Sequence, residues 1–408
     1  MTKMLSNQPS TPTPLGLYLH IPWCPTRCIY CDFNTYIDGE AGLKTAYHQA
    51  LLREIREAGA ALERPSLATI FIGGGTPTTL TPDELLELVE AVRAAFALEP
   101  QAEITTEANP GSLSVDYLRA IRQGGINRLS LGVQSFDEAE LRFLSRLHDA
   151  DTARRAIEQA RAVGFDNINL DLIFNLPQQS LAQWQFSLQE ALYLEPDHLS
   201  IYSLIVEPGT PLHRQVSAGQ VPPPDDDVAA EMYAHTIETL AAAGYAQYEI
   251  SNWARLRGEA SWQTPGLASA HNLIYWRNQP YLGLGAGAFG TLNGQRGMNV
   301  KRPQQYIQRI ETGSGLGSAW EEKSREPIDR ETAMAEQMLL GLRLTREGVG
   351  AAEFTARFGL SLADHFQEAI AFGLERELLE WIDPPAGPRL RLTYRGRFLA
   401  NQVVMQFV

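Results

Sequence analysis

The sequence predicts an α/β protein: a partial, open (βα)6 barrel followed by a smaller C-terminal α+β domain of winged-helix-like build. Two observations predict this fold. Short apolar or β-branched runs alternate with amphipathic stretches from residue 15 to about residue 208, and beyond that point the alternation stops. Alternating βα units form a parallel sheet, and six units are too few to close an eight-stranded barrel.

Each expected strand is a short run rich in Leu, Ile, Val or Thr. The six runs are LGLYLHI (15–21), ATIFIG (68–73), EITTEAN (103–109), RLSLGVQS (128–135), NINLDLIF (168–175) and HLSIYSLI (198–205). Amphipathic spacing predicts helices around them at 43–59, 81–97, 114–123, 137–146, 151–163 and 180–192. Thr81-Pro82-Asp83-Glu84 is typical of a helix start.

The chain beyond residue 208 carries different signals. VPPPDDD (221–227) predicts a turn into a helix at 227–243, and AQYEISNWA (246–254) predicts one more strand. A Gly-rich stretch covers 281–294. From about residue 325, a region rich in Leu, Glu and Arg predicts helices that end in a short hairpin and a closing helix.

The length of the chain suggests more than one core. A chain of 408 residues exceeds the size at which a single hydrophobic core usually stops growing. We therefore expect a disordered lead-in at 1–14, the barrel with its C-terminal extension at 15–300, and a small C-terminal domain at 301–408.

Charge and hydropathy argue against three classes of protein: nucleic-acid-binding, secreted and membrane-spanning proteins. The formal net charge is −14 and no run of Lys and Arg offsets it, so a nucleic-acid partner is not expected. The first residues, MTKMLSNQPSTPTP, lack the apolar core of a secretion signal, and no stretch of about 18 apolar residues follows. The sequence predicts a cytoplasmic protein without a transmembrane segment.

All three cysteines lie on one short segment, as Cys24, Cys28 and Cys31 in HIPWCPTRCIYCDF. Thiolates suit zinc or an iron–sulfur cluster, and three of them leave a fourth coordination position open. Their odd number in a long chain disfavours a disulfide framework. A Cys3His zinc site that includes His20 remains an alternative, whereas the aromatic neighbours of the thiols favour a cluster shielded from water.

Polar residues follow or end the expected strands, where the chemistry of such a barrel takes place. Gly73-Gly74-Gly75 follows the second strand, where backbone without side chains would let a polar ligand approach the amides. A plain tight turn remains the alternative. Glu107 ends the third strand and Gln134 the fourth, although Glu107 could equally be a solvated or capping carboxylate. Asp171 lies inside the apolar fifth strand, where a carboxylate needs a partner or a ligand hydroxyl.

Six ordered motifs resemble the radical S-adenosylmethionine enzymes. They are HIPWCPTRCIYCDF, GGGTPT, TTEANP, LSLGVQSF, LSRLHDA and DLIFNLP. They resemble the branch that contains the oxygen-independent coproporphyrinogen III oxidases and related heme chaperones. The resemblance covers about residues 15–300, with a weaker match in the C-terminal tail. It implies a radical-SAM barrel whose 4Fe-4S cluster is held by Cys24, Cys28 and Cys31 and binds S-adenosylmethionine at its fourth iron.

The resemblance also implies which residues surround S-adenosylmethionine. Tyr18 matches a tyrosine near the cluster, and Gly74 and Gly75 match glycines that contact the methionine portion. Ile205 matches a backbone contact to the adenine. The remaining implied contacts are Glu107, Gln134, Arg146 and Asp171, with Asp171 expected on the ribose hydroxyls.

Two features of the chain resemble the heme-chaperone branch more than the oxidases. The oxidases carry a further cysteine two residues after the third one, where this chain has Phe33. The segment HNLIYW resembles that branch's HNxxYW signature, and His271 within it could serve a heme iron. Asn175 and Phe289 depart from the usual family pattern, so the loop after the fifth strand could differ in shape. Secondary candidates for the heme ligand are His20, His148 and His198.

The expected function is therefore that of a heme chaperone that hands heme to an unidentified acceptor protein. The alternative is an oxygen-independent coproporphyrinogen III oxidase, against which Phe33 argues. Whether the protein is an enzyme stays open. A homodimer and a peripheral membrane contact stay open as well.

Overall fold

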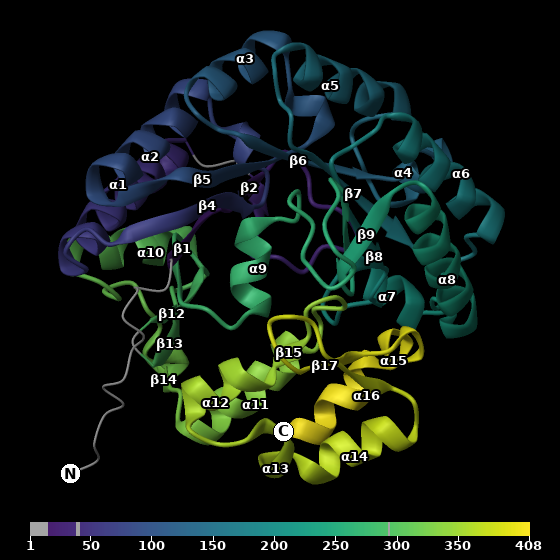
Figure 1. Cartoon of the computed structure of the whole chain (residues 1–408). Coiled ribbons are helices and arrows are strands. Elements are labelled where there is room, and N and C mark those ends of the chain that lie inside the picture. Colours follow the sequence, from purple (N-terminus) through teal and green to yellow (C-terminus); the bar gives the residue numbers. More distant parts are fainter. Residues whose placement is uncertain (1–14, 38–40, 293) are drawn as a thin grey trace.

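The computed structural model describes residues 15–37, 41–292 and 294–408, so the expected lead-in at 1–14 lies outside the described residues. A curved twelve-stranded sheet forms the centre of the molecule (Figure 1). Helices cover its convex face, while α9 (Ala270–Trp276) stands on the concave side. The C-terminal domain lies across the open side of this arc in Figure 1.

All six predicted barrel strands are present and run parallel to one another. Their order in the sheet follows their order in the chain. They are β1 (Leu15–Ile21), β4 (Ser66–Gly74), β5 (Ala97–Ala108), β6 (Arg128–Gln134), β7 (Ile168–Phe174) and β8 (His198–Ser203). The expected partial (βα)6 barrel is confirmed.

The crossover helices also follow the predicted alternation. They are α1 (Leu43–Ala61), α2 (Pro82–Ala95), α3 (Val115–Gln123), α4 (Glu138–Phe143), α5 (Ala150–Ala162) and α6 (Leu181–Tyr193). Local sequence fixes where they begin. Thr81 and Glu84 form a capping box at α2, as Ser180 and Gln183 do at α6. Each box satisfies backbone amides that have no partner within the helix.

The Gly-rich stretch extends the sheet beyond β1. β11 (Tyr281–Leu284) pairs parallel to β1, and β12 (Phe289–Leu292), β13 (Gln295–Met298) and β14 (Glu326–Pro327) continue antiparallel. Gly283 is required there, because a Cβ atom at this position would lie 1.8 Å from the carbonyl oxygen of Phe289. The sequence analysis noted this Gly-rich segment but did not predict that it adds strands to the sheet beside β1.

The far edge of the sheet differs from the prediction. The expected single strand at 246–254 is a hairpin of β9 (Tyr245–Glu249) and β10 (Asn252–Arg255), preceded by α7 (Pro211–Ser217) and α8 (Asp226–Ala242). β10 pairs antiparallel with β8. β9 pairs with β10 in turn, so this short segment adds two strands to the sheet. The alternation of residues along one run does not reveal such a hairpin.

A buried glutamate joins the extension to the barrel. Glu54 of α1 accepts hydrogen bonds from the Gly285 amide at 2.8 Å, from Tyr306 Oη at 2.7 Å and from Asn299 Nδ2 at 2.8 Å. Tyr306 lies on α10 (Pro303–Thr312), which packs against α1. These bonds offset the cost of burying the carboxylate. Gly285, Asn299 and Tyr306 are thereby anchored to the first helix of the barrel.

The C-terminal domain has its own buried core and a three-stranded sheet in the order β15-β17-β16. The hairpin expected within residues 389–408 lies earlier in the chain. It is formed by β16 (Leu379–Ile382) and β17 (Arg389–Leu392), and β15 (Val349–Gly350) pairs with β17 on its other side. The closing helix is confirmed as α15 (Tyr394–Phe398) and α16 (Ala400–Val404). The other helices of this domain are α11 (Arg330–Gly341), α12 (Ala351–Phe358), α13 (Leu362–His365) and α14 (Gln367–Glu375).

The division between the two cores bears on the expected domain boundary. The core of the barrel includes Tyr306, Ile310 and Ala319, and the second core begins with Met334. We therefore propose that the boundary lies between Ala319 and Met334, later in the chain than the expected position near residue 300.

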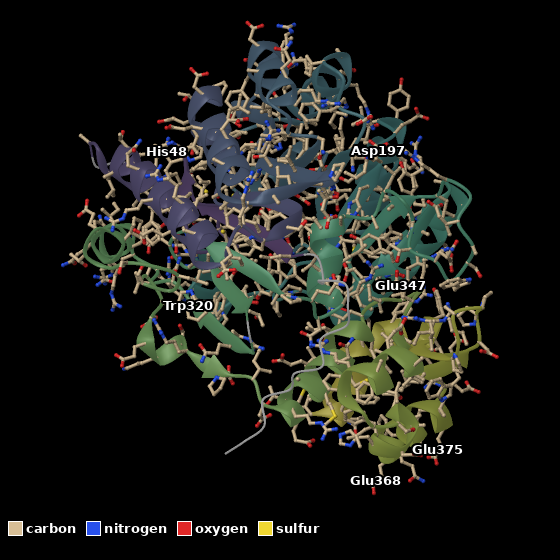
Figure 2. All side chains as sticks on the ribbon, turned by 60° about the vertical axis from the view of Figure 1, so that its left-hand side comes forward. His48, Asp197, Trp320, Glu347, Glu368 and Glu375 are labelled. Atoms are coloured by element: carbon tan, nitrogen blue, oxygen red, sulfur yellow. The ribbon has the colours of Figure 1, made fainter. Side chains whose placement is uncertain are left out.

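Polar contacts hold the two domains together. Thr345 donates through Oγ1 to the carbonyl of Gln247 at 2.8 Å, and Arg277 forms a bidentate pair with Glu347 at 2.6 and 3.1 Å. Glu347 lies where the barrel meets the C-terminal domain in Figure 2. Such paired hydrogen bonds fix orientation as well as contact. Within the described residues, no helix is long and apolar enough to cross a membrane.

Candidate functional site

The three cysteines lie at the carboxyl end of β1. Cys24 ends the short strand β2 (Trp23–Cys24), which pairs with β3 (Tyr36–Ile37), and Cys28 and Cys31 follow in the loop between them. All three are free thiols and half-buried. Thr76 Oγ1 donates to Cys24 Sγ at 3.6 Å, and Arg146 Nη1 donates to Cys28 Sγ at 3.3 Å. The loop is thus fixed to the ends of β4 and of α4.

The thiols open onto a cavity of about 800 Å³, which we call the outer cavity. Six of the residues predicted from the family resemblance line it as well: Gly74, Gly75, Glu107, Gln134, Arg146 and Asp171. They come from the ends of β4, β5 and β6, from the loop after α4 and from β7. Residues from five chain segments therefore surround one space beside the thiols, which is the geometry that the strand-end positions predicted.

Two predicted cofactor residues lie elsewhere. Tyr18 lines a neighbouring cavity on the concave side of the sheet, and its hydroxyl is bonded to His20 Nδ1 at 2.9 Å. Ile205 lines neither cavity, and 67% of it is exposed beyond the end of β8. Their contacts to S-adenosylmethionine remain predictions that have less geometric support than those of the other six.

The donor set fits an iron–sulfur cluster better than a closed zinc site. Both ring nitrogens of His20 are occupied, Nδ1 by Tyr18 and Nε2 by the carbonyl of Asn34 at 2.9 Å. Across the described residues, no group of three His, Cys, Asp or Glu side chains is arranged to hold a single metal ion. In a cluster each thiolate binds its own iron, so the sulfur atoms need not meet at one point. Three thiols on an open cavity match that requirement.

Burial affects the thiols before any metal binds. It raises the pKa of Cys24 and of Cys31, because a thiolate is poorly solvated in this loop. Both thiols are therefore protonated at neutral pH, and a metal must displace those protons to bind.

The glycine turn after β4 serves close packing. Gly74 has φ +113°, and a Cβ atom there would lie 2.4 Å from the ring of His20. A Cβ atom on Gly75 would lie 2.6 Å from the carbonyl oxygen of Trp23. The amides are already used, since Gly74 donates to Glu107 Oε2 at 2.9 Å and Gly75 to the Ile21 carbonyl at 2.8 Å. A ligand that approaches these glycines would meet amides that already have acceptors, and the contact of Gly74 and Gly75 with S-adenosylmethionine remains a prediction.

Asp171 has the partners that its position in a buried strand required. Asn169 Nδ2 donates to Oδ1 at 2.8 Å, and Ser130 Oγ donates to Oδ2 at 3.4 Å. Burial raises the pKa of Asp171 despite these donors. Asp171 and Glu107 line both the outer cavity and its neighbour, so these two carboxylates stand at the border between them.

Glu107 is a strongly perturbed carboxylate at this border. Its pKa rises from 4.5 to about 7, mainly because of burial and secondly because of the nearby Asp171 carboxylate. The Gly74 amide and the charge of Arg128 oppose the shift. Near neutral pH, Glu107 therefore exists in both protonation states.

The raised pKa of Glu107 predicts a pH dependence of stability. The folded protein holds this proton more tightly than the unfolded chain, so the stabilisation is complete below about pH 4.5 and is lost as pH rises through about 7. The free energy of unfolding of wild type relative to Glu107→Gln should fall by about 3 kcal/mol across that window. Urea unfolding at several pH values measures it. The exposed Glu99→Gln should show no such trend, and a flat difference for Glu107→Gln would contradict the assignment.

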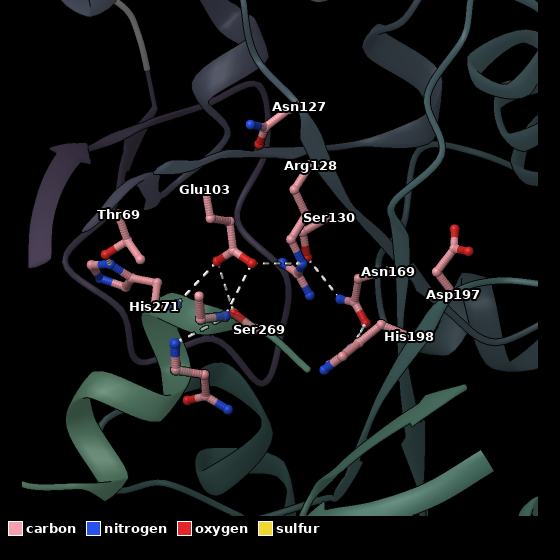
Figure 3. A network of polar contacts seen from close by, with 12 residues as sticks. Thr69, Glu103, Asn127, Arg128, Ser130, Asn169, Asp197, His198, Ser269 and His271 are labelled. Carbon is pink, nitrogen blue, oxygen red and sulfur yellow. Dashed lines mark hydrogen bonds and ion pairs between the residues drawn. The ribbon is translucent and has the colours of Figure 1, made fainter. Parts of the chain in front are cut away.

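The neighbouring space, which we call the inner cavity, measures about 520 Å³. Figure 3 shows part of its polar wall, which includes Arg128 and Ser130 of β6, Asn169 of β7, His198 of β8 and His271 of α9. Its lining includes Arg128, Ser130, Asn169, His198, Ser200, Asn252, Ser269 and Asn272, which sequence analysis did not select as a group. The sequence does contain a pattern that could have predicted this polar wall. Three apolar strands carry polar residues at alternate positions, so that each pair faces the same side of the sheet: 128 and 130, 169 and 171, and 198 and 200.

The candidate heme ligand His271 lies on the wall of the inner cavity with both ring nitrogens engaged. Nδ1 contacts Thr69 Oγ1 at 2.7 Å and Nε2 contacts Tyr275 Oη at 2.8 Å. Burial lowers its pKa to about 3, so the ring is neutral. His148 and His198 are likewise bonded through both nitrogens. An iron atom at His271 would have to displace one of these partners.

Comparison with known proteins gives two matching family models. The Radical SAM superfamily matches residues 18–191, which include the three cysteines, and the HemN C-terminal domain matches residues 328–399. Heme chaperone HemW of Bacillus subtilis is 37% identical over 395 residues, covering 96% of this chain and 98% of that protein. The HemW of Escherichia coli is 35% identical over 406 residues, covering 97% and 98%.

The chain belongs to the HemW family of radical SAM proteins. The resemblance inferred from the six motifs is therefore confirmed. The fold of this HemW-family chain is also that of a solved oxidase: coproporphyrinogen III oxidase (HemN) from Escherichia coli matches with a TM-score of 0.80 and 25% identity, covering 97% of this chain and 90% of the other. The C-terminal domain is included in that match.

Proposed function

We propose that this protein is a heme chaperone that binds heme and hands it to an acceptor protein. The observation that carries the proposal is its similarity to HemW proteins over nearly the full length of both chains. Phe33 supports it, because this residue stands where the oxidase branch has a further cysteine. It is 66% exposed at the rim of the outer cavity.

The cofactors in this proposal are a 4Fe-4S cluster on Cys24, Cys28 and Cys31 and S-adenosylmethionine in the outer cavity. The cluster would supply an open iron for the amino acid part of S-adenosylmethionine. The chain would supply the walls of the site, with Asp171 accepting hydrogen bonds from ribose hydroxyls. Arg146, which already bonds to Cys28, holds the cluster loop in place.

An oxygen-independent coproporphyrinogen III oxidase is the second candidate. The similarity in fold to HemN over 97% of the chain favours it, since both cavities belong to that shared barrel. The missing cysteine at position 33 argues against it. The two candidates differ in whether the protein converts a porphyrinogen or only carries heme.

One experiment separates them. The protein is reconstituted anaerobically with iron and sulfide, titrated with heme, and then mixed with an apo-heme protein, while a parallel sample receives coproporphyrinogen III, S-adenosylmethionine and a reductant. We expect a Soret band that moves to the acceptor and no protoporphyrinogen IX. Conversion of coproporphyrinogen III would establish the oxidase, and failure to bind heme would refute the chaperone.

The same titration tests His271 as the heme ligand. His271→Ala should shift the Soret band or weaken heme binding, because a neutral imidazole is a common axial ligand. His235→Ala, on α8, is the control. An unchanged spectrum and affinity in His271→Ala would remove this residue from the heme site. A cytoplasmic location and the absence of a nucleic-acid partner remain predictions.

A further inference from the structure

Arg128 is a charged residue of the inner cavity to which the proposed function gives no role. It opens β6, is 2% exposed and lines the cavity. Its Nε atom is buried without a hydrogen-bond partner among the described residues. Its carboxylate contact there is Glu103 Oε2 at 3.9 Å, beyond hydrogen-bond range (Figure 3). A buried guanidinium therefore lines the cavity with its Nε donor unfilled.

The acidic groups around Arg128 are already satisfied by other donors. Glu103 accepts bonds from the amides of Ala270 and His271, each at 3.0 Å. Asp171 accepts from Asn169 and Ser130, and Glu107 accepts from the Gly74 amide. These carboxylates lower the electrostatic cost of the buried cation, but none of them fills the planar fork of its N–H groups.

Arg128 is also the only cationic side chain among the described residues that line the inner cavity. The two histidines of the lining, His198 and His271, are neutral, because burial lowers the pKa of both. A ligand with two acceptor oxygens would satisfy the guanidinium, since arginine binds carboxylates through paired N–H···O bonds.

We propose that the inner cavity binds an organic carboxylate, with Arg128 as its bidentate anchor. The hydroxyl and amide groups of Ser130, Ser200, Asn252 and Asn272 surround the same space and offer further hydrogen bonds. Phe71 and Tyr275 line it too and suit the hydrocarbon part of the ligand. The shared border at Asp171 and Glu107 places this ligand next to the outer cavity.

Two sources share this chemistry. One is a free small organic acid, and the other is the propionate arm of a tetrapyrrole that reaches into the cavity. The second source rests on the proposed function, because it requires that the protein binds heme.

The test uses the reconstituted full chain and two probes. Soret titration compares heme with heme dimethyl ester, in which both carboxylates are blocked, and thermal unfolding compares sodium propionate with sodium chloride at equal ionic strength. Wild type should bind heme about tenfold or more tightly than the diester if the arm is the ligand. If a free acid is the ligand, propionate should raise Tm by about 2 °C or more.

Arg128→Gln should abolish whichever effect wild type shows. Arg128→Lys keeps the charge but cannot form the paired bonds, so it should retain only a small part of the effect. This variant replaces Arg128→Gln in the test if the Gln variant folds poorly. Arg142→Gln, on the exposed face of α4, is the matched control and should behave as wild type.

The proposal is overturned if wild type shows neither effect, or if the folded Arg128 variants retain it fully. If wild type fails to bind heme at all, the chaperone function fails, and the propionate measurement still decides the role of Arg128. A third outcome separates the two proposals. Here wild type and Arg128→Gln bind heme with the same affinity and the same preference over the diester, while propionate has no effect that depends on Arg128. In that case the carboxylate site fails and the chaperone function stands.

Discussion

Replacing Cys24, Cys28 or Cys31 with Ser is expected to abolish the iron–sulfur cluster. All three thiols open onto the outer cavity, and the described residues provide no fourth cysteine that could substitute. A cluster with three protein ligands cannot keep its open iron for S-adenosylmethionine if one of the three is lost. Each single variant should therefore lose essentially all bound iron, together with S-adenosylmethionine binding.

The measurement is iron, sulfide and visible absorption after anaerobic reconstitution, with about four iron and four sulfide per chain expected in wild type. Circular dichroism reports whether each variant folds. Phe33→Leu is the matched control, because this residue lies on the same loop and is 66% exposed. Stoichiometric zinc without iron in wild type, or full iron content in a Cys variant, would refute the cluster assignment.

Replacing Asp171 with Ala is expected to weaken S-adenosylmethionine binding while the cluster stays intact. Asp171 lies on the wall of the outer cavity, and the cysteine loop is not among its hydrogen-bond partners. A hydrogen bond to a charged group contributes about 1.5–3 kcal/mol, so the loss corresponds to a Kd about 10-fold to 100-fold higher. Iron content should equal that of wild type.

Calorimetric titration of the reconstituted protein with S-adenosylmethionine measures this effect. Asp166→Ala changes an exposed carboxylate just before β7 and serves as the control. Asp171→Ala also leaves Asn169 and Ser130 without their acceptor, so thermal unfolding of each variant must accompany the titration. An affinity equal to wild type would remove Asp171 from the cofactor site.

The candidate site could be predicted only in part from the sequence. The position of a polar residue at the end of a strand is local information, so the strand pattern alone placed Glu107, Gln134 and Gly74 at one mouth of the barrel. The family resemblance added Arg146, which lies after a helix. The resemblance also gave Ile205, which lines neither cavity, so its backbone contact to the adenine remains a prediction.

The histidines show a second limit. A sequence identifies an imidazole and its neighbours along the chain, but the partners of its nitrogens come from distant segments. His271 contacts Thr69, which lies 202 residues away. Whether the ring is free to bind iron therefore depends on how α9 packs against β4, which no pattern along the chain encodes.

The sequence by itself determined the six βα units, the position of the cysteine loop and the membership of the HemW branch, because strand alternation, helix caps and motif spacing depend on neighbouring residues. Only the tertiary structure decided that Glu54 anchors the extension, that the Gly74 and Gly75 amides are occupied, and that Arg128 lines a cavity with its Nε atom lacking a hydrogen-bond partner. These features arise where segments far apart in the chain meet. Their contacts depend on sheet order, register and curvature rather than on local sequence.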